Sequence, residues 1–269
     1  MHGIGNDYVY LDAFKGMPQN PSEIARKLSD RHCSVGGDGV IFVTASKIAD
    51  GGMRMFNADG SEGKMCGNGI RCVGKFLHDI KGIKKDILTV ETLSGVKTLR
   101  LRLKGNEVES VTVDMGKAEL DPKSLPALFA GEKVVNERLK VGGKQYGVTL
   151  VSMGNPHCVI FGSCQLVEKI GKSVSCHEKF PDGANAEFVE VLSENRLKMR
   201  VYERGSGETL ACGTGACASA VAAVLGGYCA AGEEITVQLL GGDLKIVYTG
   251  EGVSMTGEAT LAFTGEVDL

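Results

Sequence analysis

The sequence contains no tryptophan, only six prolines and no long run of basic residues. With a formal net charge of −3, it lacks the electrostatic footprint of a nucleic-acid-binding protein. The longest apolar stretch, 216–225, is too short to span a bilayer, and the first twenty residues carry no signal-peptide pattern. These absences predict a soluble cytoplasmic protein that binds neither nucleic acid nor membrane. A chain of 269 residues has room for about two domains.

Paired-cysteine motifs are also absent. The nine cysteines are an odd number and no C-x-x-C pair occurs, which argues against both a disulfide framework and a zinc site. We therefore expect no metal, and we expect seven of the thiols to be small, buried, hydrophobic side chains. These seven are Cys33, Cys72, Cys158, Cys164, Cys176, Cys217 and Cys229.

Glycine, in contrast, is abundant. The chain has 38 glycines among 269 residues, about twice the usual share of ~7%. They are not gathered in a low-complexity tract, so we assign them to turns between short strands. Many tight turns of this kind favour a mostly antiparallel sheet.

One cysteine-bearing segment occurs twice. Residues 57–80 and 203–226 each place a cysteine nine residues after the end of a predicted strand, at Cys66 and Cys212. A Cys-Gly-polar-Gly turn and an apolar helical run follow in both copies. The first-turn N–H groups and the dipole of a helix stabilise a thiolate at its N-terminus. One such thiol in each half indicates a paired acid and base rather than a single nucleophile.

Other landmarks recur in the same order in both halves. A Gly-Asn pair precedes an early strand, a helix candidate and two strands follow, and three strands come after each Cys-led helix. We predict an α/β fold (α+β type) with two pseudo-symmetric domains, each a curled, mostly antiparallel sheet around a central Cys-led helix. The active site is expected in the cleft between them. The predicted domains are 1–117 and 118–257, and a C-terminal strand at 258–269 is expected to rejoin the first.

The duplicated turns suit a specific chemistry. Backbone N–H groups at Gly67, Asn68, Gly213 and Thr214 would form a double anion site for a carboxylate. A base on one face of a carbon and an acid on the other is what inversion of a Cα–H centre requires. No pyridoxal-lysine signature, P-loop or Rossmann motif is present, so no cofactor is expected.

Several motifs together resemble one family over nearly the whole chain. They are MHGIGND, FNADGSE, MCGNGIRC, SMGNPHC, VYERGSGETLACGTGAC and MTGEAT. The chain is similar to the diaminopimelate epimerases, which are cofactor-independent isomerases that interconvert LL- and meso-2,6-diaminopimelate in bacterial lysine and peptidoglycan precursor synthesis. The resemblance implies a cytoplasmic homodimer, although Phe263 stands where the family usually has a dimer-contact tyrosine.

The resemblance also implies roles for individual residues. Cys66 and Cys212 would be the two bases, and His157 and Glu203 would assist proton transfer. Some relatives carry a substrate-contacting glutamine where Gly39 stands here. The substrate-binding residues implied by the match are Asn6, Asn57, Gly67, Asn68, Asn155, Asn185, Glu203, Arg204, Gly213 and Thr214. Arg204 agrees with a substrate whose distal end carries both a carboxylate and an ammonium group, because that carboxylate needs a cationic partner.

Three alternatives stay open at this point. A proline or hydroxyproline racemase would share the two thiols but has no use for Arg204 and several asparagines. A redox protein would join Cys66 to Cys212 in a disulfide, and an amino-acid-binding module would keep the anion site without needing both thiols. Individually, an asparagine after glycine is most often a turn residue, Glu203-Arg204 suits a surface ion pair, and His157 suits a core histidine.

Overall fold

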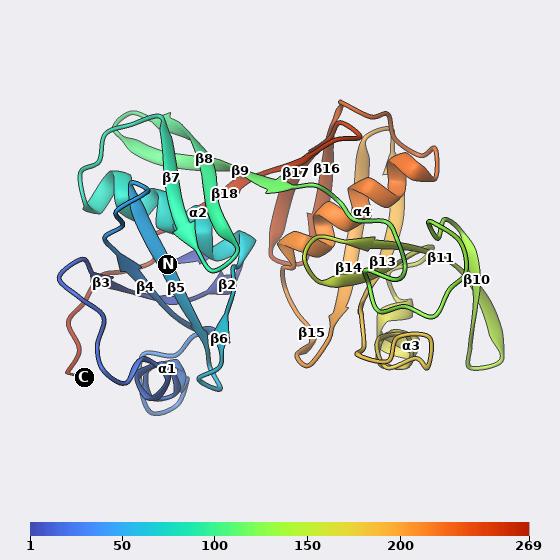
Figure 1. Ribbon diagram of the computed structural model, residues 1–269, viewed down its shortest axis with the longest axis horizontal. Coiled ribbons are helices and arrows are strands. Elements are labelled where there is room, and N and C mark those ends of the chain that lie inside the picture. Colours follow the sequence, from blue (N-terminus) through green and yellow to red (C-terminus); the bar gives the residue numbers. More distant parts are fainter. Residues whose placement is uncertain (269) are drawn as a thin grey trace. The chain divides into compact units, whose positions relative to one another are not determined.

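The computed structural model describes residues 1–268, and the chain forms two compact units (Figure 1). Unit 1 contains Met1–Asp114 and the residues from Thr256 onward, and unit 2 contains Met115–Met255. The boundaries between them fall inside β9 (Glu107–Gly116) and β18 (Val253–Glu258). The predicted α/β class is confirmed, with more strand than helix in both units. No helix among the residues described is long and apolar enough to cross a membrane.

Unit 1 is built on a sheet with the order β3-β4-β5-β7-β8-β9. Its helices are α1 (Pro21–Ser29), α2 (Gly67–Lys75) and a π-helical turn, η1 (Phe76–Ile80). The pairs β3-β4 and β5-β7 are parallel, and β4-β5, β7-β8 and β8-β9 are antiparallel. The strands besides β9 are β1 (His2–Gly3), β2 (Asn6–Asp7), β3 (Val9–Ala13), β4 (Gly39–Thr44), β5 (Gly51–Asn57), β6 (Glu62–Gly63), β7 (Ile87–Thr92) and β8 (Gly95–Lys104).

Unit 2 has the order β10-β11-β12-β13-β14-β16-β17. Its helices are α3 (Leu166–Ser175) and α4 (Gly213–Leu225). The pairs β12-β13 and β14-β16 are parallel, and the other neighbours in this order are antiparallel. The strands are β10 (Glu137–Val141), β11 (Lys144–Ser152), β12 (Pro156–Phe161), β13 (Asn185–Ser193), β14 (Arg196–Glu203), β15 (Gly207–Glu208), β16 (Glu234–Leu239) and β17 (Gly242–Tyr248).

The strand pairings repeat between the units. The run β3-β4-β5-β7-β8 alternates parallel, antiparallel, parallel and antiparallel pairs, and β12-β13-β14-β16-β17 does the same. The short strands β6 and β15 pair with β5 and β14, immediately before each Cys-led helix. Two sheets with the same pairing sequence are what a duplicated chain produces, so the repeat seen in the cysteine segments extends to the topology.

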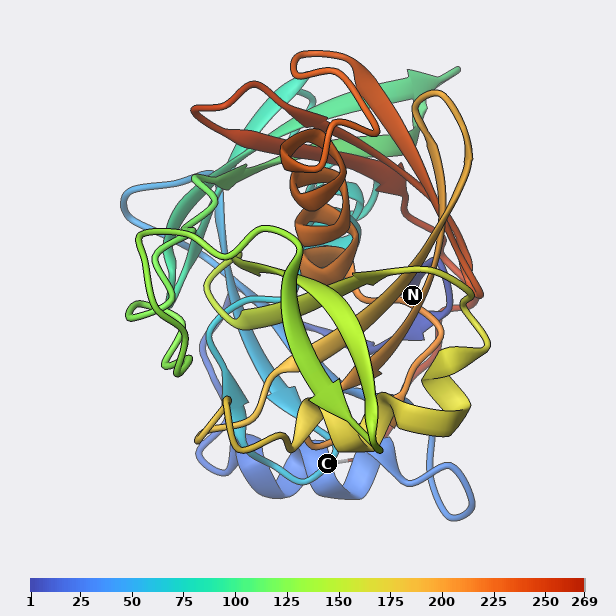
Figure 2. The same cartoon turned by 90° about the vertical axis from the view of Figure 1, so that its right-hand side faces the viewer.

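The Cys-led helices are the buried helices of their units. Every residue of α2 is buried, and α4 is Ala-rich with apolar side chains all round, as a helix enclosed by a sheet requires. In Figures 1 and 2, α4 crosses the strands of its own sheet. By contrast, α1 and α3 are amphipathic and bury one face, which includes Leu28 in α1 and Val174 in α3.

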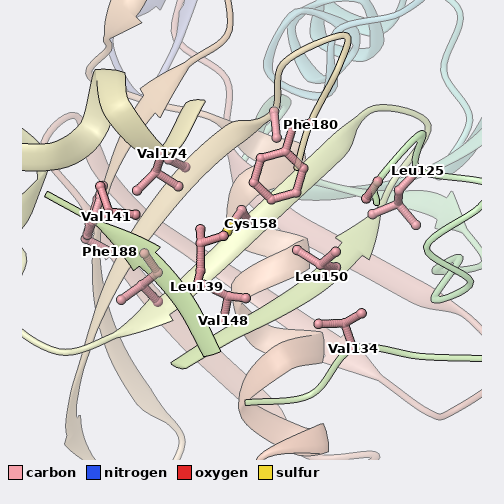
Figure 3. Packing of buried hydrophobic residues seen from close by; sticks show 14 of the residues in the cluster. Leu125, Val134, Leu139, Val141, Val148, Leu150, Cys158, Val174, Phe180 and Phe188 are labelled. Atoms are coloured by element: carbon pink, nitrogen blue, oxygen red, sulfur yellow. The ribbon is translucent and has the colours of Figure 1, made fainter. Parts of the chain in front are cut away.

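The core of unit 2 fills the space between its sheet and α3. Phe188 from β13, Leu150 from β11 and Leu139 from β10 meet there with Phe180 (Figure 3). Phe188 is fully buried, and burying a side chain of this size contributes about 1.5–3 kcal/mol. This packing fixes β12 and β13, the two strands that carry the polar residues of the candidate site.

The sheets are mostly antiparallel, as predicted. Parallel pairs also occur in both of them, because residues 14–38 and 162–184 cross over between neighbouring strands through a helix. The hairpin β10-β11 was not predicted, since it has no counterpart in unit 1. The tail 259–268 is not a strand, because within it only Thr260 makes an isolated bridge, to His2. Phe263 is exposed. Residue 269 of the expected strand lies outside the described residues. Cys33 and Cys176 are exposed rather than buried.

Candidate active site

Cys66 is the N-cap of α2. Its backbone is extended, with φ −127° and ψ 122°, and its Sγ accepts the N–H of Gly69 at 3.4 Å. A Cβ at Gly69 would lie 2.6 Å from Ile41 Cδ1, so glycine at this position lets the first turn of α2 pack against Ile41. A sulfur that receives a first-turn N–H lies in the positive end of the helix dipole, which favours the thiolate.

Polar side chains from the start of the chain reach Cys66. The Cys66 thiol donates to Asn6 Oδ1 at 3.4 Å, and Asn6 Nδ2 donates to Asp38 Oδ2 at 2.6 Å. Asp38 is held in turn by the Arg31 guanidinium at 3.0 Å. Asn57 lies at the end of β5 and donates to Ser61 Oγ at 3.0 Å, without a described bond to the Cys66 group.

Arg71 holds the first turn of α2 in place. This side chain is fully buried and donates from Nη1 to Asn68 Oδ1 at 3.0 Å and to the Gly67 carbonyl at 3.1 Å. Its Nε donates to the Glu258 carbonyl at 3.2 Å. Asn68 is buried, and its side chain is used to hold Arg71 rather than to face solvent. The backbone N–H groups of Gly67 and Asn68 therefore belong to a rigid turn.

Cys212 repeats this local geometry at the start of α4. It is the N-cap, with φ −120° and ψ 104°, and its Sγ accepts the N–H of Gly215 at 3.3 Å. Thr214 Oγ1 lies 3.5 Å from the same sulfur. Unlike Cys66, which is partly exposed, Cys212 is buried. Burial raises the pKa of the Cys212 thiol well above its usual value, and the carboxylates of Glu203 and Glu187 raise this pKa further.

Glu203 closes the strand that leads to Cys212. Its Oε1 accepts a short hydrogen bond from the Thr209 hydroxyl. Burial raises the pKa of this carboxyl, against the Thr209 hydrogen bond and the nearby His157, which lower it. Glu203 therefore disfavours ionisation of the Cys212 thiol, whereas the hydrogen bond from Cys212 lowers the pKa of Glu203.

His157 and Glu187 form a buried pair beside them. His157 Nδ1 lies 2.6 Å from Glu187 Oε1, and both side chains are fully buried. The other ring nitrogen of His157, Nε2, lies 3.0 Å from Asn155 Oδ1, so both nitrogens of the ring have a polar partner. The pairing follows from the parallel register of β12 and β13, which sets His157 opposite Asn185, two residues from Glu187.

Arg204 and Asn185 form a second polar group in unit 2. Asn185 Oδ1 accepts the backbone N–H of Arg204 at 2.8 Å, and Arg204 Nη1 donates to the Asp182 carbonyl at 2.9 Å. Arg204 borders a cavity of ≈ 440 Å³ that Tyr202 and Gly183 also line. The exposed Arg204 side chain thus borders this cavity, whose lining does not include Cys212 or Asn185.

The comparison with known proteins bears on what this arrangement does. The family model described as diaminopimelate epimerase matches residues 1–120 and 149–262. A diaminopimelate epimerase of Methanococcus maripaludis is 48% identical, covering 100% of this chain and 98% of its own length. One from Desulfovibrio desulfuricans is 50% identical, covering 99% and 96%. The chain belongs to the diaminopimelate epimerase family. It is therefore an isomerase.

Solved structures relate this diaminopimelate epimerase family fold to a wider group. A probable proline racemase from Agrobacterium radiobacter K84 superposes with a TM-score of 0.69 at 14% identity, covering 100% of this chain and 91% of its own. Identity this low shows the shared fold and carries no substrate with it. The family match, not this likeness, separates the chain from the racemase alternative.

The family residues named from the sequence fall into four groups. Unit 1 brings Asn6, Gly67 and Asn68 to Cys66, and unit 2 brings Glu203 and Thr214 to Cys212. His157 and Asn155 contact each other, as do Asn185 and Arg204. At Gly39 a Cβ would lie 2.2 Å from the Phe56 carbonyl oxygen, so no glutamine fits here without movement of the backbone.

Sequence reasoning missed Glu187 and Asp38. Glu187 stands inside the apolar strand ANAEFVEV, and a carboxylate in such a run is a signal that could have identified it. Asp38 lies in the turn SVGGDG and carries no such signal, since an aspartate among glycines is ordinary loop composition.

The environment of Cys212 predicts a specific pH dependence. Its raised pKa keeps the thiol protonated at neutral pH, so its alkylation should accelerate only as pH rises through that raised value. Glu203→Gln removes one of the charges responsible, and the midpoint of the alkylation profile should move to lower pH. Peptide mapping after iodoacetamide treatment measures it, with Glu208→Gln as the control, because Glu208 pairs with Arg200 instead. An unchanged or higher midpoint in Glu203→Gln would contradict this account.

Proposed function

We propose that the chain converts LL-2,6-diaminopimelate to meso-diaminopimelate by proton transfer at Cα between Cys66 and Cys212, without a cofactor. Its place is in bacterial-type lysine and peptidoglycan precursor biosynthesis. The observation that carries this proposal is the repeated cap: each cysteine begins a buried helix, and each sulfur accepts the N–H three residues ahead. A redox or binding protein does not need each of two thiols to lie at the N-terminus of a helix.

In the proposed reaction the two thiols act on opposite faces of one Cα. The thiolate of one takes the Cα proton, and the thiol of the other delivers its proton to the opposite face, so the site has exchanged roles after each turnover. The raised pKa of Cys212 suits it to be the acid at rest, which assigns the first base to Cys66. First-turn N–H groups at Gly67, Asn68, Gly213 and Thr214 hold the carboxylate and stabilise charge that develops on it.

The distal amino-acid end of the substrate requires its own contacts. Arg204 supplies a cation for the distal carboxylate, and Asn57, Asn155 and Asn185 supply amide groups for its carboxylate and ammonium. The exposure of the Arg204 side chain, which leaves it accessible to a ligand, supports this assignment. A proline ring would leave the same arginine unused.

His157 and Glu203 are proposed to adjust the pKa of Cys212, which acts as the acid. Glu203 raises the pKa of Cys212 and can share its proton, while His157 lowers the pKa of Glu203. Glu187 acts through His157 by fixing the ring. Proton exchange between thiol, carboxyl and ring then resets the site between turnovers.

Glu187→Gln is expected to lower kcat about 10–100-fold with little change in KM, because a neutral amide holds the His157 ring more weakly than a carboxylate and no longer raises the pKa of Cys212. The expected signature is a displaced alkaline limb in the pH profile of kcat, measured by a coupled assay. Glu190→Gln on the same strand is the matched control, since Glu190 accepts from the Cys164 N–H instead. Equal effects of the two variants would remove Glu187 from the site.

Solvent deuterium incorporation tests the proposed function directly. Reduced protein is incubated in deuterated water with LL-diaminopimelate, and with proline and lysine in parallel, and Cα–H signals are followed by NMR. Exchange with inversion in diaminopimelate alone is the expected result. Exchange confined to proline would make the protein a racemase of that substrate. No exchange in any of them would leave a redox or binding role.

We also propose that the protein works as a cytoplasmic homodimer. Phe263 and Leu261 are exposed in the C-terminal segment, where the family resemblance implies a dimer contact. Light scattering on the full chain should give twice the monomer mass of 28.4 kDa, and a monomer would refute the proposal.

A further inference from the structure

A line of hydrogen bonds leads from the surface to the sulfur of Cys66. Arg31 Nη2 donates to Asp38 Oδ1 at 3.0 Å, and Asp38 Oδ2 accepts Asn6 Nδ2 at 2.6 Å. The opposite end of the same amide, Asn6 Oδ1, accepts from the Cys66 thiol at 3.4 Å. Neither Asp38 nor Arg31 belongs to the family residues named above.

Asp38 decides which way the Asn6 amide points. An ionised carboxylate only accepts hydrogen bonds, so it takes the NH₂ end of the amide and leaves the carbonyl toward the sulfur. The reversed amide would set its carbonyl oxygen against Asp38 Oδ2, and that contact is repulsive at 2.6 Å. Asp38 Oδ2 is itself held by the backbone N–H of Asp7 at 3.2 Å.

The orientation of the amide matters for the proton on Cys66. A carbonyl next to the sulfur accepts from the thiol and disfavours the thiolate, whereas an NH₂ group there would donate to the thiolate and favour it. The Gly69 N–H acts in the opposite direction, toward thiolate. The other polar groups described around this point are the Tyr10 hydroxyl, which donates to the Gly69 carbonyl, and the Asp7–Arg31 pair behind Asp38.

We propose that Asp38 is a positioning residue that holds the Asn6 carbonyl against Cys66, and so favours the protonated form of this cysteine in the unliganded protein. The inference rests on the proposed function, in which Cys66 is one of the two bases. Breaking the hydrogen bond between the thiol and Asn6 Oδ1 removes this bias toward the protonated form. This arrangement protects a partly exposed thiol from alkylation and oxidation in the unliganded protein.

The test is the pH profile of Cys66 alkylation, which needs no substrate. In Asp38→Ala the amide is free to reverse and donate to the sulfur. A downward shift of about one pH unit would raise the thiolate fraction about tenfold below the midpoint. Lower intrinsic nucleophilicity removes about a factor of three, so iodoacetamide should modify Cys66 about threefold faster at pH 7. Peptide mapping by mass spectrometry isolates Cys66, with exposed Cys176 as the internal reference.

Asp38→Asn separates orientation from charge. It removes the negative charge, but the Asp7 N–H still requires an acceptor at the inner position, so the oxygen of the introduced amide stays there and keeps Asn6 in place. We expect a profile close to that of the unmodified protein. Matching profiles for Asp38→Ala and Asp38→Asn, or no shift in Asp38→Ala, would overturn the proposal.

Two further measurements complete the test. Asn6→Ala removes the carbonyl acceptor itself and should also lower the midpoint, which covers a failure of Asp38→Ala to fold. Buried Cys72 reports on general loosening, and it should stay unmodified in every variant. If the Cys66 profile shifts as expected but diaminopimelate shows no exchange, the proposed function fails while the role of Asp38 stands. If diaminopimelate is epimerised and the profile does not move, only the role of Asp38 fails.

Discussion

Alanine at either Cys66 or Cys212 is expected to lower kcat/KM for epimerisation by about 10³-fold or more in both directions. The reason is that inversion needs an acid and a base on opposite faces, and each positioned group contributes about 10²–10⁴ to the rate. Loss of either therefore stops inversion, whichever isomer is supplied. Circular dichroism of each variant checks that the fold is kept, and a coupled assay measures both directions.

The half-reaction distinguishes two bases from one. A variant that keeps one of the two proposed catalytic thiols can still remove and return a proton on its own face of Cα. Cys66→Ala and Cys212→Ala should therefore each exchange deuterium into only one stereoisomer, and the two variants should act on different stereoisomers. Cys33→Ala and Cys176→Ala are matched controls, because they remove an exposed thiol from unit 1 and unit 2 respectively. Full epimerisation by either single-thiol variant would refute the two-base mechanism.

Elements with a local sequence pattern were predicted well. The helix candidate that precedes each Cys-led helix is present as α1 and α3, and three strands follow each Cys-led helix as expected. The Cys-Gly-polar-Gly turns gave both caps, because a helix start is determined by its own few residues and by the N–H groups they must satisfy. Cys66 and Cys212 could thus be placed at helix N-termini from the sequence alone.

What could not be predicted depends on contacts distant in sequence. Glu187 meets His157 only because β12 and β13 pair in parallel, and nothing near either residue encodes that register. Asp38 reaches Asn6 across 32 residues. The tail after Glu258 was expected to be a strand because it follows the second repeat, but among residues 259–268 only Thr260 forms a bridge, and Leu261, Phe263 and Val267 are exposed.

The proposed positioning residues share one physical property: each holds a group of the candidate site in place and, in the proposed mechanism, does not contact the substrate. Glu187 turns the His157 ring, Asp38 turns the Asn6 amide, and Arg71 holds the first turn of α2. Polar groups buried in this way are costly unless they are satisfied, so each is held by strong, charge-assisted bonds. Removing one should then affect the site and, where burial is complete, the stability of the fold.

Arg71→Met should give the largest loss of stability, about 3 kcal/mol. The substitution nearly keeps the volume but withdraws the donors from Asn68 Oδ1 and from the carbonyls of Gly67 and Glu258, in a fully buried place. Each buried acceptor left without its donor costs about 1–3 kcal/mol, and the removal of a buried charge offsets part of the sum. In a chain of this size the thermal midpoint should fall by about 6–12 °C.

Differential scanning calorimetry measures this effect, and Arg100→Met is the control. Arg100 lies exposed on β8, so its replacement should leave the midpoint within about 1 °C. Because the first turn of α2 loosens in Arg71→Met, KM for diaminopimelate should rise more than kcat falls at a temperature where the variant is folded. Arg71→Lys keeps the charge but lacks the several N–H donors of a guanidinium. Its thermal midpoint should lie between those of Arg71→Met and Arg100→Met. A midpoint in Arg71→Met equal to that of Arg100→Met would show that the three acceptors find other donors, and that the turn carrying Gly67 and Asn68 does not depend on Arg71.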